Sequence, residues 1–274
     1  MVKEPVVKPL NPSPKNKTNP LIVTEAAEEK INENNFYFSK AILRKDGFVY
    51  FSVFLKIRIL KFVAISDTHC RHNNIKLPKG DVLLHAGDIC YKGHKEEVVD
   101  FLKWFEKQDF QHKIFIAGNH DFYLEKARQQ EIEGLIPKNV VYLNDSGITI
   151  DGINIWGSPI TPWFFNWAFN RHRGEEIQKH WNLIPADTDI LLTHGPVLGI
   201  HDIVINSQHV GCRDLLEKIK EIKPKTHICG HIHEGYGVTE KFGVKFINAC
   251  VLNESYELVN KPVVFTLPSS LDPA

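Results

Sequence analysis

The stretch IRILKFVAISDTH, residues 57–69, sets the pattern on which the fold of this chain is built. Residues 57–65 are mostly apolar, as in a buried strand, and they lead into a turn that carries Asp67 and His69. The same arrangement, an apolar run followed by a short polar motif, recurs along the chain. Because ligands in α/β folds bind beyond the carboxyl ends of strands, this repetition predicts a site assembled from several strand ends.

Four further apolar runs precede polar motifs. They are residues 82–85 before Gly87-Asp88, 113–117 before Gly118-Asn119-His120-Asp121, 189–193 before His194-Gly195, and 226–229 before Gly230-His231-Ile232-His233. Helices are expected between the strands, and further strands complete the set. The expected helices span residues 96–107, 174–181 and 212–222, and the further strands span 140–143, 148–156, 245–248 and 263–267. Strands that alternate with helices predict an α/β fold.

Composition and charge narrow the class of protein. The chain has 274 residues, 43% of them hydrophobic, which suits one large domain or two small ones. Lys+Arg and Asp+Glu are both 33, so no basic field exists to attract nucleic acid, and specific nucleic-acid binding is not expected. The 5 cysteines are scattered, which favours reduced thiols over a disulfide framework. No signal peptide or membrane span is recognisable, so we expect a soluble, cytoplasmic protein that does not bind membranes; its oligomeric state stays open.

The N-terminal region differs in composition from the rest. Residues 1–35 are rich in proline and polar residues at their start and are expected to be disordered, with weak evidence for a short helix within 21–35. Residues 36–55 are expected to form a hairpin-like extension with strands at 36–43 and 48–55, because Asp46-Gly47 is a hairpin signal. The main domain is expected at 56–268, followed by a tail at 269–274.

The polar motifs contain seven side chains suited to binding metal ions: Asp67, His69, Asp88, Asn119, His194, His231 and His233. A carboxylate has two oxygens and can bridge two cations, and Asp88 is the residue we expect in that position. Imidazoles suit manganese, iron, zinc or nickel. The pattern therefore predicts two divalent metal ions, with manganese expected to support activity in vitro. Two such ions activate a shared water, so the expected reaction is attack of a metal-bridging hydroxide on a phosphate ester.

His120 adjoins the expected ligand Asn119 and is well placed to protonate the leaving oxygen. Asp121 is expected to accept a hydrogen bond from His120 and fix its orientation. Each motif alone also has an ordinary structural interpretation as a helix N-cap, a turn or a polar loop. Their joint occurrence at strand ends is what favours a metal site. His85 and His227 lie within apolar strands and are expected in the core, and His72 is a candidate for a supporting position near Asp67.

The motifs D-x-H, G-D, G-N-H-D, T-H-G and G-H-x-H, in this order, resemble those of the calcineurin-like metallophosphoesterases. The resemblance covers about residues 56–268, and longer stretches around Gly157-Ser158-Pro159 and His194-Gly195-Pro196 are similar to the metallophosphoesterase-domain-containing branch. That branch is similar to class III cyclic nucleotide phosphodiesterases. The resemblance implies an α/β sandwich of two mixed β-sheets flanked by helices. It also implies two ligand sets: Asp67, His69, Asp88 and His233 on one ion, and Asp88, Asn119, His194 and His231 on the other.

These observations favour a metal-dependent phosphodiesterase that acts on small phosphodiesters or nucleotides, such as cyclic nucleotides. A phosphomonoesterase is one alternative, and a regulatory protein that binds metal and nucleotide with little turnover is another. The aromatic segment 163–169 is either a core or lid cluster or a wall of the substrate cleft, and Arg171 and Arg173 beyond it are candidates for contacting phosphate. The physiological substrate and the native metal do not follow from the sequence.

Overall fold

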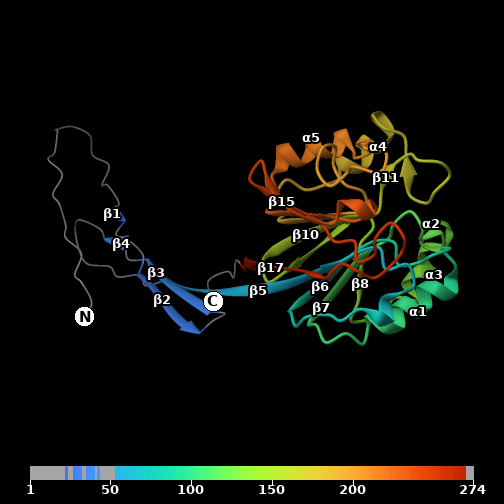
Figure 1. Cartoon of the computed structure of the whole chain (residues 1–274). Helices are drawn as coiled ribbons and strands as arrows, with labels where there is room; N and C mark the ends of the chain where they lie inside the picture. The colour runs from blue at the N-terminus through green and yellow to red at the C-terminus, as the bar shows by residue number, and fades with distance from the viewer. Residues whose placement is uncertain (1–21, 24–26, 33–34, 41, 44–52, 270–274) are drawn as a thin grey trace. The chain divides into compact units, whose positions relative to one another are not determined.

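The computed structural model describes residues 22–23, 27–32, 35–40, 42–43 and 53–269. The chain divides into two compact units, one of residues 1–56 with 273–274 and one of residues 57–272. The larger unit contains two β-sheets with helices on their outer faces (Figure 1). Among the described residues, no helix has the length and apolar character that crossing a bilayer requires.

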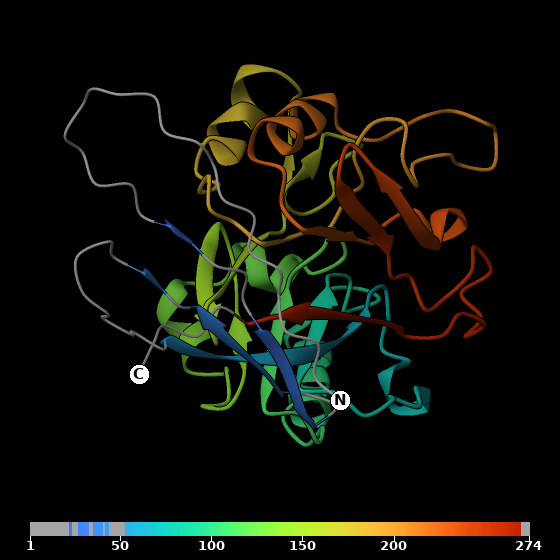
Figure 2. The ribbon, with the colours of Figure 1, turned by 90° about the vertical axis from the view of Figure 1, so that its left-hand side faces the viewer.

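The first sheet of the larger unit is parallel except at one edge. Its order is β17, β5, β6, β7, β8, with β17 antiparallel to β5 and the others parallel. The strands are β5 (Val53–Ile65, in this unit from Ile57), β6 (Val82–Ala86), β7 (His112–Ile116), β8 (Val141–Tyr142) and β17 (Val263–Pro268). Figure 2 shows β17 running alongside β5.

The second sheet is mixed, with the order β15, β16, β14, β13, β10, β9. Its four central strands are parallel, and the outer strands β9 and β15 are antiparallel to their neighbours. The strands are β9 (Ser146–Ile150), β10 (Ile153–Ser158), β13 (Ile190–Thr193), β14 (Thr226–Cys229), β15 (Gly237–Lys241) and β16 (Val244–Asn248). A separate short pair, β11 (Thr161–Pro162) and β12 (Asn170–Arg171), is parallel.

The sandwich follows from side chains that alternate between the two faces of each strand. On β5, Leu60, Phe62 and Ala64 join a buried cluster that also contains Ile155 and Leu192 of the second sheet. The intervening residues of β5 point the other way, into a second cluster that contains the helices. The apolar runs are continuous because both faces of these strands are covered, as in buried parallel sheets.

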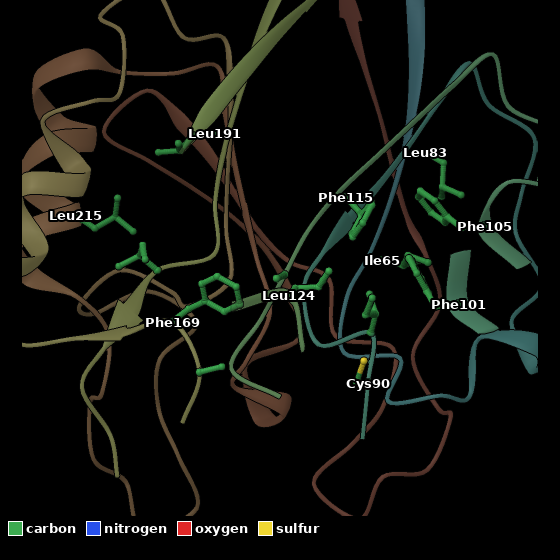
Figure 3. Close-up of a cluster of buried hydrophobic side chains, with 14 of the residues drawn as sticks. Ile65, Leu83, Cys90, Phe101, Phe105, Phe115, Leu124, Phe169, Leu191 and Leu215 are labelled. Atoms are coloured by element: carbon green, nitrogen blue, oxygen red, sulfur yellow. The ribbon is translucent and has the colours of Figure 1, made fainter. Parts of the chain in front are cut away.

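Helices cover the outer faces. They are α1 (Lys95–Phe105), α2 (Phe122–Lys126), α3 (Gln129–Glu133), α4 (Glu175–Trp181) and α5 (Arg213–Ile222). Phe101 and Phe105 of α1 pack against Phe115 of β7, with ring centroids 5.6 and 6.0 Å apart. Figure 3 shows this group beside Ile65 and Leu83, and a second group that includes Leu191 and Leu215 under the other helices. The three longer helices lie at the positions expected from apolar spacing.

Several elements of the larger unit differ from the sequence-based expectation. The single strand expected at 148–156 is a hairpin, because Asp151 and Gly152 both have positive φ, 46° and 75°, as a tight turn between β9 and β10 requires. The short helices α2 and α3 and the edge strand β15 were not expected. Each is too short or too polar to produce a clear apolar period.

The smaller unit also differs. Its antiparallel hairpin is formed by β2 (Ala27–Asn32) and β3 (Asn35–Lys40), and β1 (Ile22–Val23) pairs with β4 (Ile42–Leu43). Residues 27–32 are therefore a strand, where disorder or a helix was expected. The expected turn at 44–47 and most of the strand at 48–55 lie outside the described residues.

Candidate metal centre

The expected ligands all follow the C-terminal ends of parallel strands. Asp67 and His69 follow β5, Asp88 follows β6, Asn119 follows β7, His194 follows β13, and His231 and His233 follow β14. Backbone hydrogen bonds join these turns to one another. Asp67 N donates to Gly87 O at 2.9 Å within the first sheet, and Gly230 N donates to His194 O at 2.9 Å within the second. Val251 N, which follows β16 of the second sheet, donates to Ser66 O after β5 of the first at 3.0 Å. Strand ends from both sheets thus meet at one edge of the sandwich.

Two carboxylates lie at the middle of the cluster and imidazoles surround them. Asp67 Oδ1 is 3.5 Å from His233 Nε2 and 3.9 Å from His69 Nε2. Asp88 uses both oxygens, with Oδ2 3.6 Å from His69 Nε2 and Oδ1 3.3 Å from His194 Nε2. Asn119 Oδ1 is 2.9 Å from His194 Nε2. Asp88 therefore lies between two groups of nitrogen ligands, the position expected of a bridging residue.

Six residues contribute ligand atoms to three compact groups, and each group could hold a cation. The groups are Asp67, His69 and His233; His69, Asp88 and His120; and Asp67, Asp88 and His194, with the atoms of each group within 4.8 Å of one another. His231 belongs to none of these groups. Its backbone N–H donates to both oxygens of Asp67 at 3.1 and 3.0 Å, and its ring lies 5.0 Å from that of His194.

Backbone carbonyls orient three of the imidazoles. Nδ1 of His69, His194 and His233 donates to Cys90 O, Ala86 O and Asn253 O at 3.0, 2.9 and 2.8 Å. With the Nδ1 proton fixed in this way, Nε2 of each ring faces the carboxylates, and it can bind a metal ion once it carries no proton. Nε2 of His69 is buried and has no hydrogen-bond partner. A buried acceptor of this kind costs free energy unless something binds it, and a metal ion would do so.

The electrostatics of the cluster also fit a cation. Asp67 and Asp88 are 0% and 2% exposed, and neither forms an ion pair with a described lysine or arginine. Burial works against charge on His194 and His233, yet Asp88 and Asp67 raise the pKa of each imidazole to about 9. Burial would raise the pKa of Asp67, but these imidazoles hold it well below its usual range. Protonated imidazoles thus stand in for the positive charge that divalent ions would supply.

The backbone at the cluster is strained. Asp67, His69, Asp88 and His231 have φ values of 54°, 39°, 57° and 68°. Non-glycine residues rarely adopt this left-handed region, and such conformations gather at functional sites. Here each one turns the chain sharply after a strand, so that the side chain points into the cluster.

The glycines of the motifs are needed because the ligands pack directly on their backbones. A Cβ on Gly118 would collide with Asp88, a Cβ on Gly230 with Asp67 and Ser66, and a Cβ on Gly87 with His194 Nδ1 at 2.6 Å. The glycine and the ligand in G-D, G-N-H-D and G-H-x-H are therefore parts of one packing arrangement. This is a physical reason for the glycines that the sequence pattern alone does not supply.

His120 borders the cluster, but the residue expected to orient it does not do so. His120 Nδ1 donates to Tyr91 O at 2.8 Å, not to Asp121. The buried Asp121 carboxylate instead accepts backbone N–H groups of Gly118 and Cys90 at 2.7 and 2.9 Å. Burial and the charge of Asp88 raise the pKa of Asp121 to about 7. Asp121 thereby links the turn after β6, through the N–H of Cys90, to the turn after β7, through the N–H of Gly118.

Several site residues were not predicted. Cys250 Sγ donates to Asp67 Oδ2 at 3.0 Å, Trp167 stacks on the ring of His120 at 4.4 Å, and the ring of Tyr256 lies 4.9 Å from that of His69. Cys250 follows β16, so its position after a strand was a usable signal. Tyr256 and Trp167 lie in irregular segments, where no local pattern indicates what they contact.

A cleft of about 620 Å³ opens over the cluster. Its lining includes Asp88, His120 and His231, and also Trp163, Phe164 and Trp167 from the aromatic segment. The segment is divided between two environments, because Ala168 and Phe169 are buried in the core. One part of the segment therefore lies in the core and another lines the cleft, and contact with a substrate stays a prediction.

The arginines beyond this segment are engaged by protein groups. Arg171 contacts Glu125 at 3.4 Å, and Arg173, which lines the cleft, donates to the carbonyls of Val210 and Gly211 at 2.7 and 2.8 Å. His85 and His227 are core residues as expected, hydrogen-bonded to Thr68 and Thr193 at 3.1 and 2.8 Å. His72 packs on α1, with Nε2 3.3 Å from Asp100.

Comparison with known proteins identifies relatives. The model of the family described as calcineurin-like phosphoesterase matches residues 60–235. Metallophosphoesterase domain-containing protein 1 of Homo sapiens is 41% identical over 233 residues, which covers 76% of this chain and 71% of that protein. The protein of the same name from Mus musculus matches with the same identity and coverage. In fold, the phosphopantetheinyl hydrolase of Mycobacterium tuberculosis is similar, with a TM-score of 0.52, 16% identity, and coverage of 72% of this chain and 90% of that one.

Proposed function

The chain belongs to the calcineurin-like phosphoesterase family, and from this premise we propose that it is a dinuclear-metal phosphodiesterase acting on small phosphodiesters such as cyclic nucleotides. Asp67, His69, Asp88 and His233 would hold one ion, and Asp88, Asn119, His194 and His231 the other. When bound, the ions would polarise phosphoryl oxygens and supply an activated water. The observation that carries the proposal is that Asp88 lines the cleft together with the imidazoles of His69, His231 and His233. The second buried carboxylate, Asp67, lies 3.5 Å from Nε2 of His233.

His120 is the proton donor in this proposal. Its Nδ1–H is fixed on Tyr91 O, and its ring contacts those of Trp167 and His69, with centroids 4.4 and 4.6 Å away. Nε2 is therefore the nitrogen that can carry a proton to a leaving oxygen in the cleft. A held imidazole loses little freedom on binding substrate, which favours proton transfer in the transition state.

The charges that line the cleft favour a diester over a monoester. A phosphodiester carries one negative charge, whereas a phosphomonoester carries nearly two at neutral pH. Among the described lining residues, Arg173 is the one arginine or lysine, and it is engaged by two carbonyls. Glu234 and Glu254 also line the cleft and would repel the second charge of a monoester.

The size and lining of the cleft support a nucleotide as the substrate. A volume of about 620 Å³ is within the usual range for small-molecule sites. Exposed rings of Trp163 and Phe164, which are 51% and 54% accessible, offer flat apolar surfaces to a base.

Turnover by metal-reconstituted protein tests this proposal. Protein stripped with chelator and reloaded with Mn²⁺ is assayed on bis(p-nitrophenyl) phosphate, p-nitrophenyl phosphate and 3′,5′-cyclic AMP, with Asp88→Asn as the site-deficient control. We expect Mn²⁺-dependent hydrolysis of both diesters, faster than that of the monoester, and loss of turnover in the control. Faster monoester hydrolysis would make the protein a phosphomonoesterase. Nucleotide binding without turnover would make it a binding protein.

A further inference from the structure

A tightly held loop, residues 203–210, lines the same cleft as the aromatic segment. Ile203 and His209 form an antiparallel bridge, and Val204 N donates to Gln208 O at 3.1 Å. Ser207, at the tip, has a φ of 63°, as a tight reversal requires. Arg173 holds the end of the loop through the carbonyl of Val210. Backbone contacts thus restrain this loop, on which several polar lining residues lie.

His209 is the most firmly oriented of these residues. Its Nδ1 is 2.7 Å from Oδ1 of Asp202, a carboxylate whose side chain is 0% exposed. Oδ2 of Asp202 accepts from Gly199 N and Gly211 N at 2.9 and 3.1 Å. The buried carboxylate therefore has its own partners and fixes the ring, while the side chain of His209 is 49% exposed in the cleft lining. Because Nδ1 is engaged, Nε2 is the atom that can meet a ligand.

The aromatic segment and loop 203–210 bring different chemistry to the lining of the cleft. Trp163 and Phe164 present aromatic faces, whereas Asn206, Gln208 and His209 present hydrogen-bonding groups. Amides and imidazole both donate and accept hydrogen bonds. A nucleobase has flat apolar faces and an edge that carries hydrogen-bond donors and acceptors. It therefore complements both the aromatic rings and the polar residues of the loop.

We propose that loop 203–210 and the aromatic residues Trp163 and Phe164 form a nucleobase subsite, in which His209, positioned by Asp202, hydrogen-bonds the edge of the base. This assignment rests on the proposed function, because it names the group that a nucleotide substrate would place away from the metal centre. It makes His209 a specificity-determining residue.

The chain offers a matched control for His209. His180 Nδ1 is 2.6 Å from Asp145 Oδ2, which is nearly the same imidazole–carboxylate geometry. His180 does not line the cleft. Loss of each imidazole therefore removes a similar imidazole–carboxylate contact, and only loss of His209 should affect a ligand.

The experiment compares His209→Ala, His209→Gln and His180→Ala in Mn²⁺-loaded protein. Isothermal titration calorimetry gives the Kd of AMP and of ribose 5-phosphate, which lacks the base, and kinetics give KM and kcat for 3′,5′-cyclic AMP. We expect His209→Ala to raise the Kd of AMP and the KM of cyclic AMP about tenfold, the cost of one well-placed hydrogen bond. His209→Gln should recover part of this loss, because its amide nitrogen reaches the position of Nε2. His180→Ala should match wild type.

Each other outcome decides the matter. Unchanged AMP affinity in His209→Ala, equal weakening of AMP and ribose 5-phosphate, or no AMP binding by wild type overturns the subsite. Weakened AMP binding in a protein that hydrolyses no phosphodiester supports the subsite and refutes the proposed function. Melting temperatures of the three variants show whether any loss comes from unfolding.

Discussion

Individual residues at the cluster are held by contacts that leave little freedom. The ligands adopt left-handed backbone conformations, the imidazoles are fixed on carbonyls, and the carboxylates pack on glycine backbones. Such a site is organised before a metal ion arrives, which lowers the entropy lost on binding. Single substitutions should therefore separate the groups that hold metal from those that act on substrate.

His120 is expected to act on substrate without holding metal. His120→Ala should keep the metal content of wild type and lower turnover of cyclic AMP by roughly 10²–10⁴, the range for a positioned proton donor. Turnover of bis(p-nitrophenyl) phosphate should fall less, because nitrophenolate leaves without a proton. Metal content by elemental analysis and rates on both esters check this. Because His120 groups with His69 and Asp88, loss of metal would instead identify it as a ligand.

Gly230 is expected to be essential for the shape of the cluster. Gly230→Ala places a Cβ against the Asp67 carboxylate and Ser66, so either the carboxylate or the turn after β14 must move. We expect reduced metal affinity and a loss of about 1–3 kcal/mol in unfolding free energy, as for other overpacked sites. The control is Gly134→Ala at the end of α3, where the nearest atom to a new Cβ is 3.3 Å away. Equal metal affinity in the two variants would contradict the steric explanation.

The strands determine where the ligands lie. They also bury two histidines, and burial shifts the pKa values of these imidazoles. Each strand directs alternate residues to the two clusters, so His85 of β6 and His227 of β14 lie in the outer layers under the helices. Burial lowers the pKa of both imidazoles to about 3. Both histidines are therefore neutral in the folded protein over the usual range of pH.

This burial predicts loss of stability in acid. Unfolded histidine takes up a proton below pH ~6.5, whereas folded His227 stays neutral to pH about 3, so the unfolded state binds more protons between these values. Stability should fall as pH decreases through this window, by up to ~1.4 kcal/mol per pH unit for each such histidine. His227→Phe should lower the slope of unfolding free energy against pH by up to ~1.4 kcal/mol per pH unit, the contribution of one proton. The comparison is with wild type and with His172→Gln, a substitution at an exposed site. Denaturant unfolding in chelator measures this slope, and an unchanged value would show that His227 does not contribute.

In the molecule as a whole, the two sheets act as one support for the centre. Asp67, Asp88 and Asn119 come from the first sheet, and His194, His231 and His233 from the second. A cation bound by both sets would join the sheets at that edge. Metal binding should therefore be linked to global stability as well as to activity.

We expect the purified protein to carry up to two divalent ions and to lose phosphoesterase activity in chelator. Its melting temperature should also fall, because a ligand at 100 times its Kd stabilises the folded state by ~2.7 kcal/mol. Added Mn²⁺ should restore both properties in wild type but not in Asp88→Asn. Elemental analysis, calorimetric melting and diester turnover are the measurements. Activity that persists without bound metal would refute the metal centre.

The sequence by itself predicted the parts of this protein that depend on local patterns. Apolar runs that end in polar turns located the central strands, and the parallel order of β5, β6 and β7 explains why Asp67, Asp88 and Asn119 lie at the same edge of the first sheet. The α/β class, the three longer helices and the seven metal-ligand candidates followed from such patterns, whereas Cys250, Trp167 and Tyr256 did not. Each of the predicted features depends on periodicity or on the chemistry of a side chain at a strand end, and both can be identified from the sequence.

Only the tertiary structure decided which partner each polar group takes. Asp121 bonds backbone of two turns rather than His120, Cys250 donates to Asp67, and Asp202 positions His209 over the cleft. These contacts join separate segments of the chain, and no local pattern indicates that they meet. Each buried acceptor takes the hydrogen-bond donor that folding places beside it. Local patterns specify the elements, but the packing of the two sheets selects the contacts between them.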